Sequence, residues 1–399
     1  MNKYHQYIVF ISQMLIVLAM EMVNPFIPTF VQQLNGGTIQ DVAPISAFII
    51  IAPMLGMILM APVWGFLGDK YGYKPMLIRA ALALIIMQWL VSFAHSVLQL
   101  LVLRFFHGCF SGFIAAMQTY AVAHGETAAR ARILARLQSS KAIGTAFGGS
   151  LGGLSIIFLS LNNLFQFAAI LCVFPLILII FFLPNLSVIK EKKTRKTAKN
   201  FYSPGILTIS TLIIFSQIAK FLPNPVFSLY VEQIIHANPI ITGFLYSLPG
   251  IAIIVGSNLM GSIFDKQRKL AEMRGSATPL LYYFLIFGCT GALLTLAHSF
   301  TSNLTGIIFI RFGWGLVFAG LLPALFATLS DRGAQQGLYI GLGNSLAKTG
   351  NLLGVLIGGY SASILPLTQL FLLSSFSYVV IILICLSNIK KQSIYSVEY

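Results

Sequence analysis

The chain alternates between long apolar blocks and short polar connections. The blocks run for about 18 to 28 residues, and a helix needs about 20 apolar residues to cross a membrane. Barrel strands would be about ten residues long with strict alternation, which these blocks lack. The pattern predicts an all-α membrane protein with twelve transmembrane helices. The predicted spans are 7–30, 44–66, 77–94, 99–123, 133–157, 165–183, 204–231, 238–263, 279–297, 302–329, 337–364 and 366–389.

Composition agrees with a membrane protein. The 399 residues are 57% hydrophobic and 9% charged, against about 25% charged in an ordinary soluble domain. The net charge of +15 does not indicate nucleic-acid binding, because the basic residues lie between apolar blocks. The four cysteines are scattered singly through those blocks, so we expect no metal, cofactor or disulfide framework. The cysteines are Cys109, Cys172, Cys289 and Cys385.

The basic residues predict the orientation of the chain. They occupy the even-numbered connections and their flanks, and the odd-numbered connections have none. Positive charge marks the cytoplasmic side, so we expect both termini inside a bacterial cell inner membrane. The groups are Lys70, Lys74 and Arg79; Arg130, Arg132 and Arg136; the run 190–199; Lys266, Arg268, Lys269 and Arg274; and Arg332.

The charged run in mid-chain predicts two halves. We expect a six-helix bundle over 1–185, a basic cytoplasmic linker over 186–203 and a second six-helix bundle over 204–399. Internal repeats agree, and duplicated halves are a transporter architecture with a site near mid-membrane. The matched sets are Arg104–Gly108 with Arg311–Gly315; Gly144, Gly148, Gly152 and Gly153 with Gly350, Gly354, Gly358 and Gly359; and Gly65 and Asp69 with Gly261 and Asp265.

The connection after the second span has an unusual sequence, GFLGDKYGYK, from Gly65 to Lys74. Glycines such as Gly72 permit a tight turn, and Asp69 can accept backbone N–H groups or pair with a cation. The segment resembles the signature loop of the major facilitator superfamily, except that Tyr73 stands where that loop usually has a basic residue. The resemblance implies a conformational latch at Gly65, Asp69, Gly72 and Lys74.

Two further motifs carry the same resemblance, which extends over the whole chain. Arg104–Gly108 resembles the fourth-helix motif of the superfamily's drug/proton antiporters, and Gly144–Gly153 resembles their fifth-helix glycine motif. Gly149 stands where that motif normally has a proline. Small residues repeated on one helix face also allow close helix packing. We expect that role for Gly144, Gly148, Gly152, Gly350, Gly354 and Gly358.

Glu21 is the acidic residue that lies well inside a predicted span. Buried charge is costly, so such residues usually face a cavity or a partner. By helical rise, Glu21 lies about 21 Å from the cytoplasmic end of its span, and Arg104 lies about 8 Å from the opposite end of its own span. In a hydrocarbon core about 30 Å thick, the two side chains are therefore at similar depths. The similar depths suggest proton coupling by Glu21 and Arg104. The alternative is a static ion pair.

Three lysines also lie inside spans, at Lys141, Lys220 and Lys348. Interior ammonium groups suit an anionic or zwitterionic substrate, although lysines also snorkel toward the membrane surface. Aromatic and amide side chains complete the predicted substrate cavity, with packing or interhelical hydrogen bonding as the alternative. These residues are Phe26, Gln118, Tyr246 and Asn344.

Prolines are placed alike in the first and seventh spans. Pro25 and Pro28 follow Glu21, and Pro223 and Pro225 follow Lys220. Interrupted helices at matching positions of two halves indicate the binding region.

These features predict a secondary transporter that works by alternating access, not an enzyme. The chain has no GxxxxGK[ST] loop for ATP. We expect proton-coupled efflux of drug-like compounds or a metabolite such as a carboxylate siderophore, by a monomer in the lipid bilayer. The rival is proton-coupled uptake of an organic anion. A membrane sensor that transports nothing ranks below both.

Overall fold

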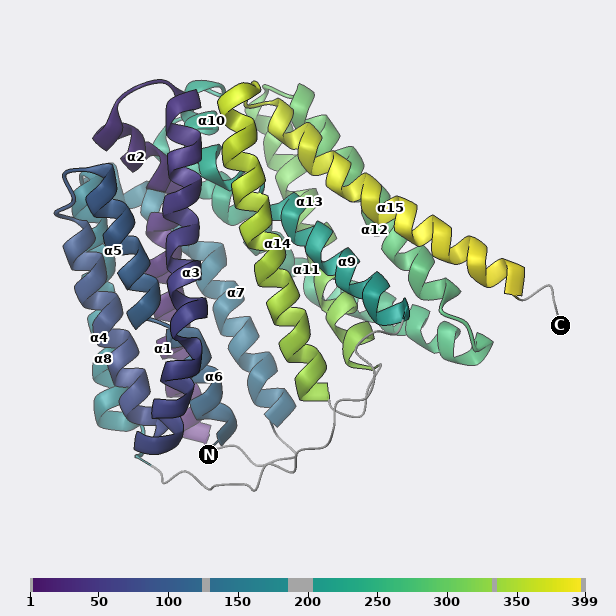
Figure 1. Ribbon diagram of the computed structural model, residues 1–399, viewed down its shortest axis with the longest axis horizontal. Helices are drawn as coiled ribbons and strands as arrows, with labels where there is room; N and C mark the ends of the chain where they lie inside the picture. The colour runs from purple at the N-terminus through teal and green to yellow at the C-terminus, as the bar shows by residue number, and fades with distance from the viewer. Residues whose placement is uncertain (1–2, 124–129, 186–203, 332–335, 396–399) are drawn as a thin grey trace. The chain divides into compact units, whose positions relative to one another are not determined.

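The computed structural model describes residues 3–123, 130–185, 204–331 and 336–395, and Figure 1 shows its elements. Within those ranges the chain is helical and contains no β-strand. The elements are α1 (Lys3–Val23), η1 (Asn24–Phe26), α2 (Ile27–Asn35), α3 (Ile39–Tyr71), α4 (Tyr73–Val91), α5 (Val97–Phe110), α6 (Phe113–Ala123), α7 (Arg130–Ser155), α8 (Leu161–Phe182), α9 (Pro204–Phe221), η3 (Asn224–Val226), α10 (Phe227–Gln233), α11 (Pro239–Arg274), α12 (Thr278–Phe300), α13 (Leu304–Ser330), α14 (Gln336–Ile364) and α15 (Gln369–Tyr395).

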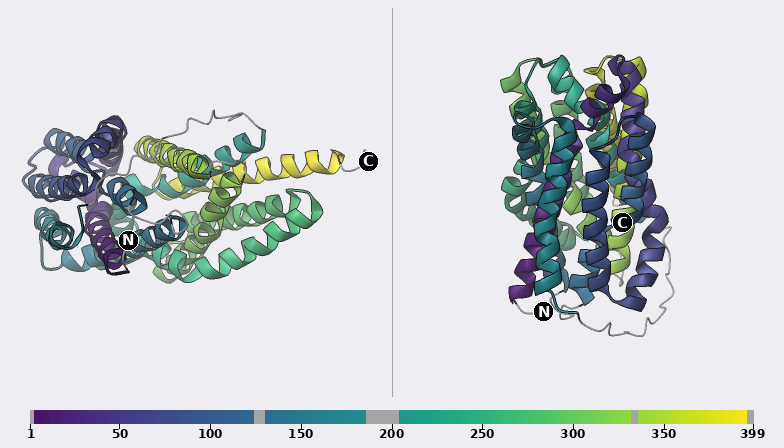
Figure 2. Two further views of the ribbon diagram at one scale, coloured as in Figure 1. Left: turned by 90° about the horizontal axis from the view of Figure 1, so that it is seen from below. Right: turned by 90° about the vertical axis from the view of Figure 1, so that its left-hand side faces the viewer.

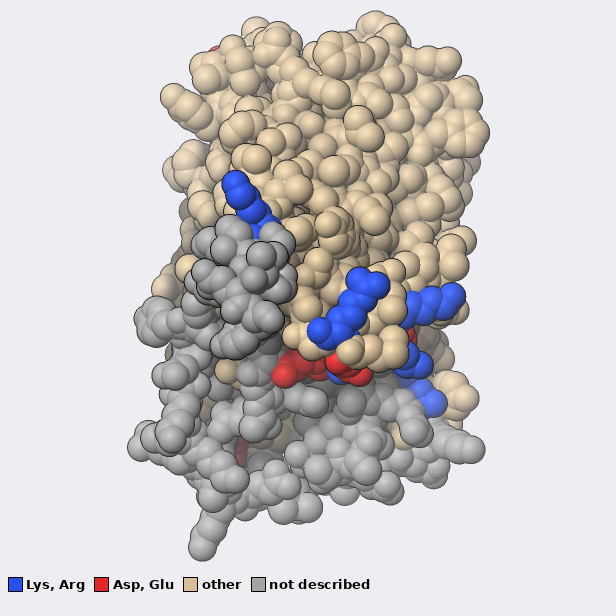
Figure 3. Space-filling model, turned by 90° about the vertical axis from the view of Figure 1, so that its right-hand side faces the viewer, with Lys and Arg blue, Asp and Glu red and all other residues tan. Residues whose placement is uncertain are grey.

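Ten helical stretches among the described residues are long and apolar enough to cross a membrane. The helices α7 and α14 have sufficient length but are richer in glycine and polar residues. With these two, the helical stretches correspond to the twelve predicted spans. The space-filling view agrees: a broad area of the face in Figure 3 is almost entirely tan, and most of its coloured side chains lie toward one end.

Two helices differ in detail from the predicted spans. The eighth span was predicted over 238–263, and α11 continues beyond it to Arg274, so the basic group that begins at Lys266 lies on a helix. The fourth span was predicted over 99–123, and the stretch Val97–Ala121 is long and apolar enough to cross a membrane, but its helix is interrupted between α5 and α6, where Gly112 has a φ of 68°. Distant side chains support the break, because Trp64 Nε1 donates to the Cys109 carbonyl (2.6 Å) and Arg79 donates to the Ser111 carbonyl (3.1 Å).

The chain groups into two compact units. Unit 1 contains residues 1–195 and 227–250, and unit 2 contains residues 196–226 and 251–399. Leu229 of α10 accordingly belongs to the same buried cluster as the core of unit 1. The division into bundles at 1–185 and 204–399 stays a prediction, and its linker, 186–203, lies outside the described residues.

Glycines bring one pair of helices together in each unit. In unit 1, Gly144, Gly148 and Gly152 of α7 lie against the backbone of α1. A Cβ on any of them would collide with a main-chain oxygen of α1 or an atom beside it. In unit 2, the same arrangement joins α14 to α9 through Gly350, Gly354 and Gly358. Figure 2 shows the long helices of unit 1 side by side.

Candidate functional site

The first span is interrupted next to Glu21, as predicted. The helix α1 ends at Val23, a 3-10 segment covers Asn24–Phe26, and α2 begins at Ile27. Pro25 has no N–H group, so it cannot donate to the carbonyl of Glu21 four residues earlier, as a helical residue would. The seventh span is interrupted in the same way, by η3. Both interruptions contain the dipeptide Asn-Pro.

The carboxylate of Glu21 receives two neutral hydrogen-bond donors. Asn24 Nδ2 donates to Glu21 Oε2 at 3.1 Å, and the hydroxyl of Tyr246 donates to the same oxygen at 3.3 Å. Glu21 is half-buried, and it has no ion pair among the described residues. Among the described residues, Glu21 is therefore held by neutral donors and not by a static ion pair.

Adjacent glycines of α7 hold both partners of this contact. A Cβ on Gly148 would lie 2.6 Å from Cβ of Glu21, and a Cβ on Gly149 would lie 2.9 Å from Cδ1 of Tyr246. The hydroxyl of Ser247 also accepts the backbone N–H of Ser150 at 2.8 Å. Gly149, where the antiporter motif normally has proline, thus allows α11 to approach α7 and bring Tyr246 to Glu21.

Arg104 does not pair with Glu21 in the structure. It is buried on α5, one turn before the buried His107, and its Nε has no hydrogen-bond partner among the described residues. Depth alone suggested that the two charges meet, but depth does not fix the side of the helix on which a side chain lies. The structure therefore brings Glu21 to Tyr246 rather than to Arg104.

The three interior lysines have different surroundings. Lys220 is half-buried, with Nζ 5.3 Å from the ring centroid of Phe318 and 5.6 Å from that of Phe221. Lys348 on α14 and Lys141 on α7 are exposed in the structure. Distances of this kind allow a cation–π attraction for Lys220.

The remaining predicted cavity residues do not form one cluster. Phe26 is buried in the core of unit 1. Gln118 is half-buried on α6, and Asn344 is exposed on α14. Tyr246 alone among these four contacts Glu21 through a hydrogen bond.

A second polar cluster joins α2 to α10 and was not predicted. The hydroxyl of Thr29 donates to Ser228 Oγ at 2.8 Å and lies 3.4 Å from both carboxylate oxygens of Glu232. Beside it, Gln233 Nε2 donates to Gln32 Oε1 at 3.1 Å. The sequence contained one signal: a shift of 200 positions aligns Asn24-Pro25 with Asn224-Pro225 and places Glu232 opposite Gln32.

The loop after α3 is built around Gly72, whose φ of 95° is in the region that favours glycine. Asp69 accepts the hydroxyl of Tyr73 at 2.8 Å, and Lys74 Nζ donates to the carbonyl of Ile180 at 2.8 Å. Tyr73, which departs from the family pattern, is therefore the partner of Asp69. A Cβ on Gly65 would meet nothing within 4 Å.

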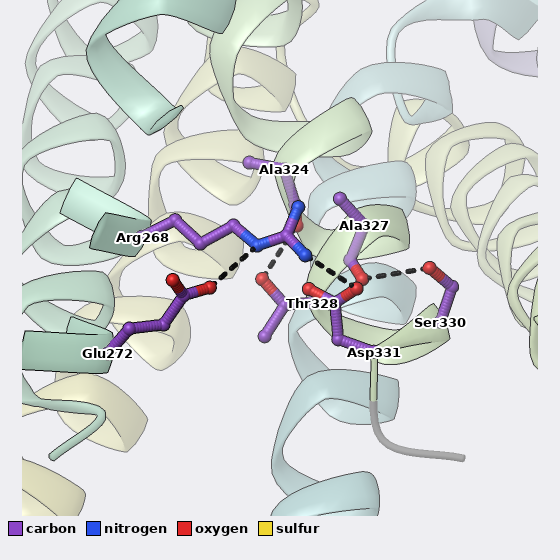
Figure 4. Close-up of polar contacts among 7 residues, drawn as sticks. All are labelled: Arg268, Glu272, Ala324, Ala327, Thr328, Ser330 and Asp331. Carbon is purple, nitrogen blue, oxygen red and sulfur yellow. Dashed lines mark hydrogen bonds and ion pairs between the residues drawn. The ribbon is translucent and has the colours of Figure 1, made fainter. Parts of the chain in front are cut away.

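The matching segment in unit 2 lies within helix α11 and uses an ion pair instead. Arg268 lies 3.1 Å from Asp331 at the end of α13 and 3.5 Å from Glu272 one turn along α11 (Figure 4). All three side chains are substantially exposed, so we expect the contribution to stability to be small.

Long apolar helices, interrupted spans and a half-buried carboxylate define a multi-pass membrane protein of the transporter class. The comparison with family models agrees: the chain belongs to the Major Facilitator Superfamily, whose model matches residues 9–354. The resemblance seen in the loop and glycine motifs is thereby confirmed, and with it the twelve-helix major facilitator fold.

Curated relatives cover nearly the whole chain. The chain is 26% identical to a "Staphyloferrin B transporter" of Staphylococcus aureus, over 96% of this chain and 93% of the relative. It is also 26% identical to a "Multi-drug resistance efflux pump PmrA homolog" of Lactococcus lactis, over 90% of this chain and 89% of the relative. Both relatives are named as transporters, which supports a transporter rather than an enzyme.

A solved structure shows the same fold. It is a bacterial homologue of the human lysosomal transporter Spinster, with a TM-score of 0.76 and 11% identity, and each chain is covered over 98%. At that identity the likeness concerns the fold alone.

Proposed function

We propose that this protein is a secondary transporter that exports a small molecule by alternating access in exchange for protons, with Glu21 as the proton-binding carboxylate. The observation that carries the proposal is the contact of Glu21 with Tyr246 and Asn24 at the interruption of the first span. A carboxylate held by neutral donors and lacking a cation can be loaded or emptied by small changes in solvation.

The coupling follows from the position of Tyr246. Its hydroxyl approaches Glu21 from α11, which belongs to a different predicted bundle. Separation of α11 from α1 would replace the hydroxyl by water and stabilise the ionised carboxylate. Proton loss and movement of α11 are then linked, as exchange of a proton for a substrate requires. Arg104 would contribute to proton coupling through its positive charge, which is buried in the same predicted bundle as Glu21.

The efflux direction is favoured by the relatives and the motifs. The drug-efflux relative supports export of drug-like compounds, and the staphyloferrin B relative supports a siderophore as substrate. We place the protein in a bacterial inner membrane as a monomer with both termini inside, because the basic residues gather on alternate connections. The two predicted bundles would then rock against each other, with Gly65, Asp69, Gly72 and Lys74 as the latch.

The proposed cavity contains the three interior lysines with Phe26, Gln118, Tyr246 and Asn344. Uptake of an organic anion by proton symport is the second candidate, and Lys220 is the observation that favours it. This lysine is half-buried beside aromatic rings, and its ammonium group supplies donors that suit an anion.

The test uses proteoliposomes that contain an internal pH dye and the purified protein. Ethidium, citrate and a citrate-based ferric chelator are added in turn, and proton and solute fluxes are both recorded. We expect wild type to exchange at least one probe for protons, and Glu21→Gln to lose proton movement while still binding that probe. Glu21→Asp, which keeps the carboxylate, should retain part of the exchange. Normal coupling in Glu21→Gln would refute the proton role.

The same vesicles separate the two directions. Exchange predicts that solute and protons move oppositely, and symport predicts that they move together. Lys220→Ala and Lys348→Ala test the charge of the substrate. If only ethidium binds, and binds equally to both variants, then the anionic substrate is wrong.

A further inference from the structure

Unit 1 contains a second half-buried carboxylate in addition to Glu21. Glu232 lies in the last turn of α10, on the span whose interruption matches that of the first span. Its carboxylate faces Thr29 of α2, and both oxygens lie 3.4 Å from the Thr29 hydroxyl. The buried Ser228, one turn earlier on α10, receives the same hydroxyl at 2.8 Å.

The two carboxylates make reciprocal contacts. Glu21 of the first span receives a hydroxyl from Tyr246 of the eighth, and Glu232 of the seventh receives a hydroxyl from Thr29 of the first. Each carboxylate therefore meets an uncharged hydroxyl from a helix of the other predicted bundle. Contact between α2 and α10 covers Glu232, whereas Tyr246 of α11 reaches Glu21 through its hydroxyl.

Among the residues that the structure describes, no cation pairs with Glu232. The elements packed most closely on α10 are α2 and η1, and neither carries a charged or titratable side chain. The titratable neighbours along the chain are the buried Tyr230 on α10 and the exposed His236, which follows that helix. Tyr246 of α11 reaches this region through ring contact with Phe227, at 5.9 Å between centroids.

These contacts determine whether ionisation of Glu232 favours or opposes the closure of α2 on α10. An ionised carboxylate covered by α2, with a shared hydroxyl as its donor, loses solvation that no cation replaces. A protonated carboxylate loses far less and can still bond to Thr29. Closure of α2 on α10 is therefore favoured by protonation of Glu232, and by reciprocity closure raises the proton affinity of Glu232.

We propose that Glu232 is a second proton-binding site, which takes up a proton as α2 closes on α10. The inference rests on the proposed proton-coupled transport, within which it gives the proton an entry point. The predicted topology places the ends of the first and seventh spans at the outer surface. A proton from outside binds the water-exposed carboxylate of Glu232, neutralises it and permits closure, before Glu21 is loaded deeper in the bundle.

The experiment measures closure directly and needs no substrate. Spin labels are attached at Gln33→Cys and Ile234→Cys, two exposed positions next to the Gln32–Gln233 hydrogen bond. The distance between the labels is recorded in lipid nanodiscs from pH 5 to pH 9, after the native cysteines are replaced. We expect the short-distance population of the otherwise unmodified protein to grow as the pH falls.

The sign of two substitutions separates a proton site from a structural hydrogen bond. Glu232→Gln imitates the protonated form, so at pH 8.5 it should raise the short-distance population about threefold or more. Thr29→Val removes the donor to the ionised carboxylate, so it should lower that population. A purely structural bond predicts that both substitutions weaken closure, and that result would overturn the proposal. Glu232→Asp, which still titrates, should keep the pH response.

Glu272→Gln is the matched control, because it makes the same substitution at an exposed glutamate of α11. It should leave the pH curve of closure unchanged. The outcome is independent of Glu21: the transport assay on Glu21→Gln tests the proposed function, and the distance measurement on Glu232→Gln tests this site. A Glu232→Gln curve that coincides with wild type rejects the second site, whatever Glu21→Gln does.

Discussion

The helix pairs α1/α7 and α9/α14 have the same packing but different chemistry. In the first pair, Gly144, Gly148 and Gly152 lie against the carbonyl oxygens of Met14, Leu18 and Met22. In the second pair, Gly350, Gly354 and Gly358 lie against those of Ile214, Ile218 and Leu222. A shift of 206 positions in one helix and 200 in the other converts the first set of contacts into the second. The contact surfaces have therefore kept their register.

The side chains just beyond these contacts have not been kept. The same shift of 200 positions places Phe221 opposite Glu21 and Lys220 opposite Met20. The first pair thus has a carboxylate at the point where the second has an aromatic ring beside a cation. Packing therefore constrains both helix pairs equally, whereas the charged side chains differ between them. We expect substitutions of the contact glycines to destabilise both pairs alike. Substitutions at Glu21 and its hydrogen-bond partners should affect proton-coupled flux through the first pair alone.

The largest effect should come from filling the glycine contacts. Gly148→Leu and Gly354→Leu both place side-chain atoms where main chain lies, and such overpacking costs about 1–3 kcal/mol or more. We expect both variants to lose most folded protein, measured as the monodisperse fraction after detergent extraction. Gly341→Leu is the control, because a Cβ there meets nothing within 4 Å. If only one of the two variants lost folded protein, then the two glycine contacts would not be equivalent.

The next effect should distinguish the pairs. Tyr246→Phe removes the hydroxyl that donates to Glu21, and a hydrogen bond to a charged group contributes about 1.5–3 kcal/mol. We expect proton-coupled flux to fall about tenfold or more, while the free energy of unfolding falls by no more than that hydrogen bond contributes. Unchanged flux would show that this contact does not serve the coupling by Glu21.

A smaller effect should separate the two Asn-Pro turns. Asn24→Ala removes a donor to Glu21 as well as a turn residue, whereas Asn224→Ala removes a turn residue next to Phe221. We expect a fewfold loss of proton-coupled flux for the first variant alone, and similar melting temperatures for both. Equal losses of flux would assign the effect to the turns themselves.

The smallest effects should come from Arg268 on α11 and from Asp69 in the last turn of α3. Arg268→Ala breaks an exposed ion pair with Asp331, so the free energy of unfolding should change by less than about 1 kcal/mol. Asp69→Asn in the first loop weakens the acceptor of the Tyr73 hydroxyl. If that loop is a latch, then Asp69→Asn slows transport while Arg268→Ala does not. Equal rates for both variants would remove the latch from the account.

Local sequence features predicted much of the scaffold. Block length predicted the spans, and prolines predicted the interruptions at η1 and η3, because both effects act within a few residues. The break between α5 and α6 was missed, because its carbonyl groups are satisfied by Trp64 and Arg79 from other helices. A Gly112 in an apolar stretch does not by itself reveal those partners.

The candidate site was predictable only in part for a similar reason. Glu21 stands out in the sequence, since a carboxylate in an apolar block is costly. Its partner does not, because Tyr246 is 225 positions away and resembles many interface tyrosines. Arg104 has a suitable depth, but depth leaves its direction around the helix open. Glu232 looked like an ordinary helix-end residue until α2 was seen to cover it.

The central claim is that Glu21 meets water from each side of the membrane in turn. The most direct measurement labels Glu21→Cys, in a chain without other cysteines, with a membrane-impermeant thiol reagent in right-side-out and everted vesicles. We predict labelling from both sides, with low pH decreasing outer access and increasing inner access. Labelling from neither side, at any pH, would contradict the account.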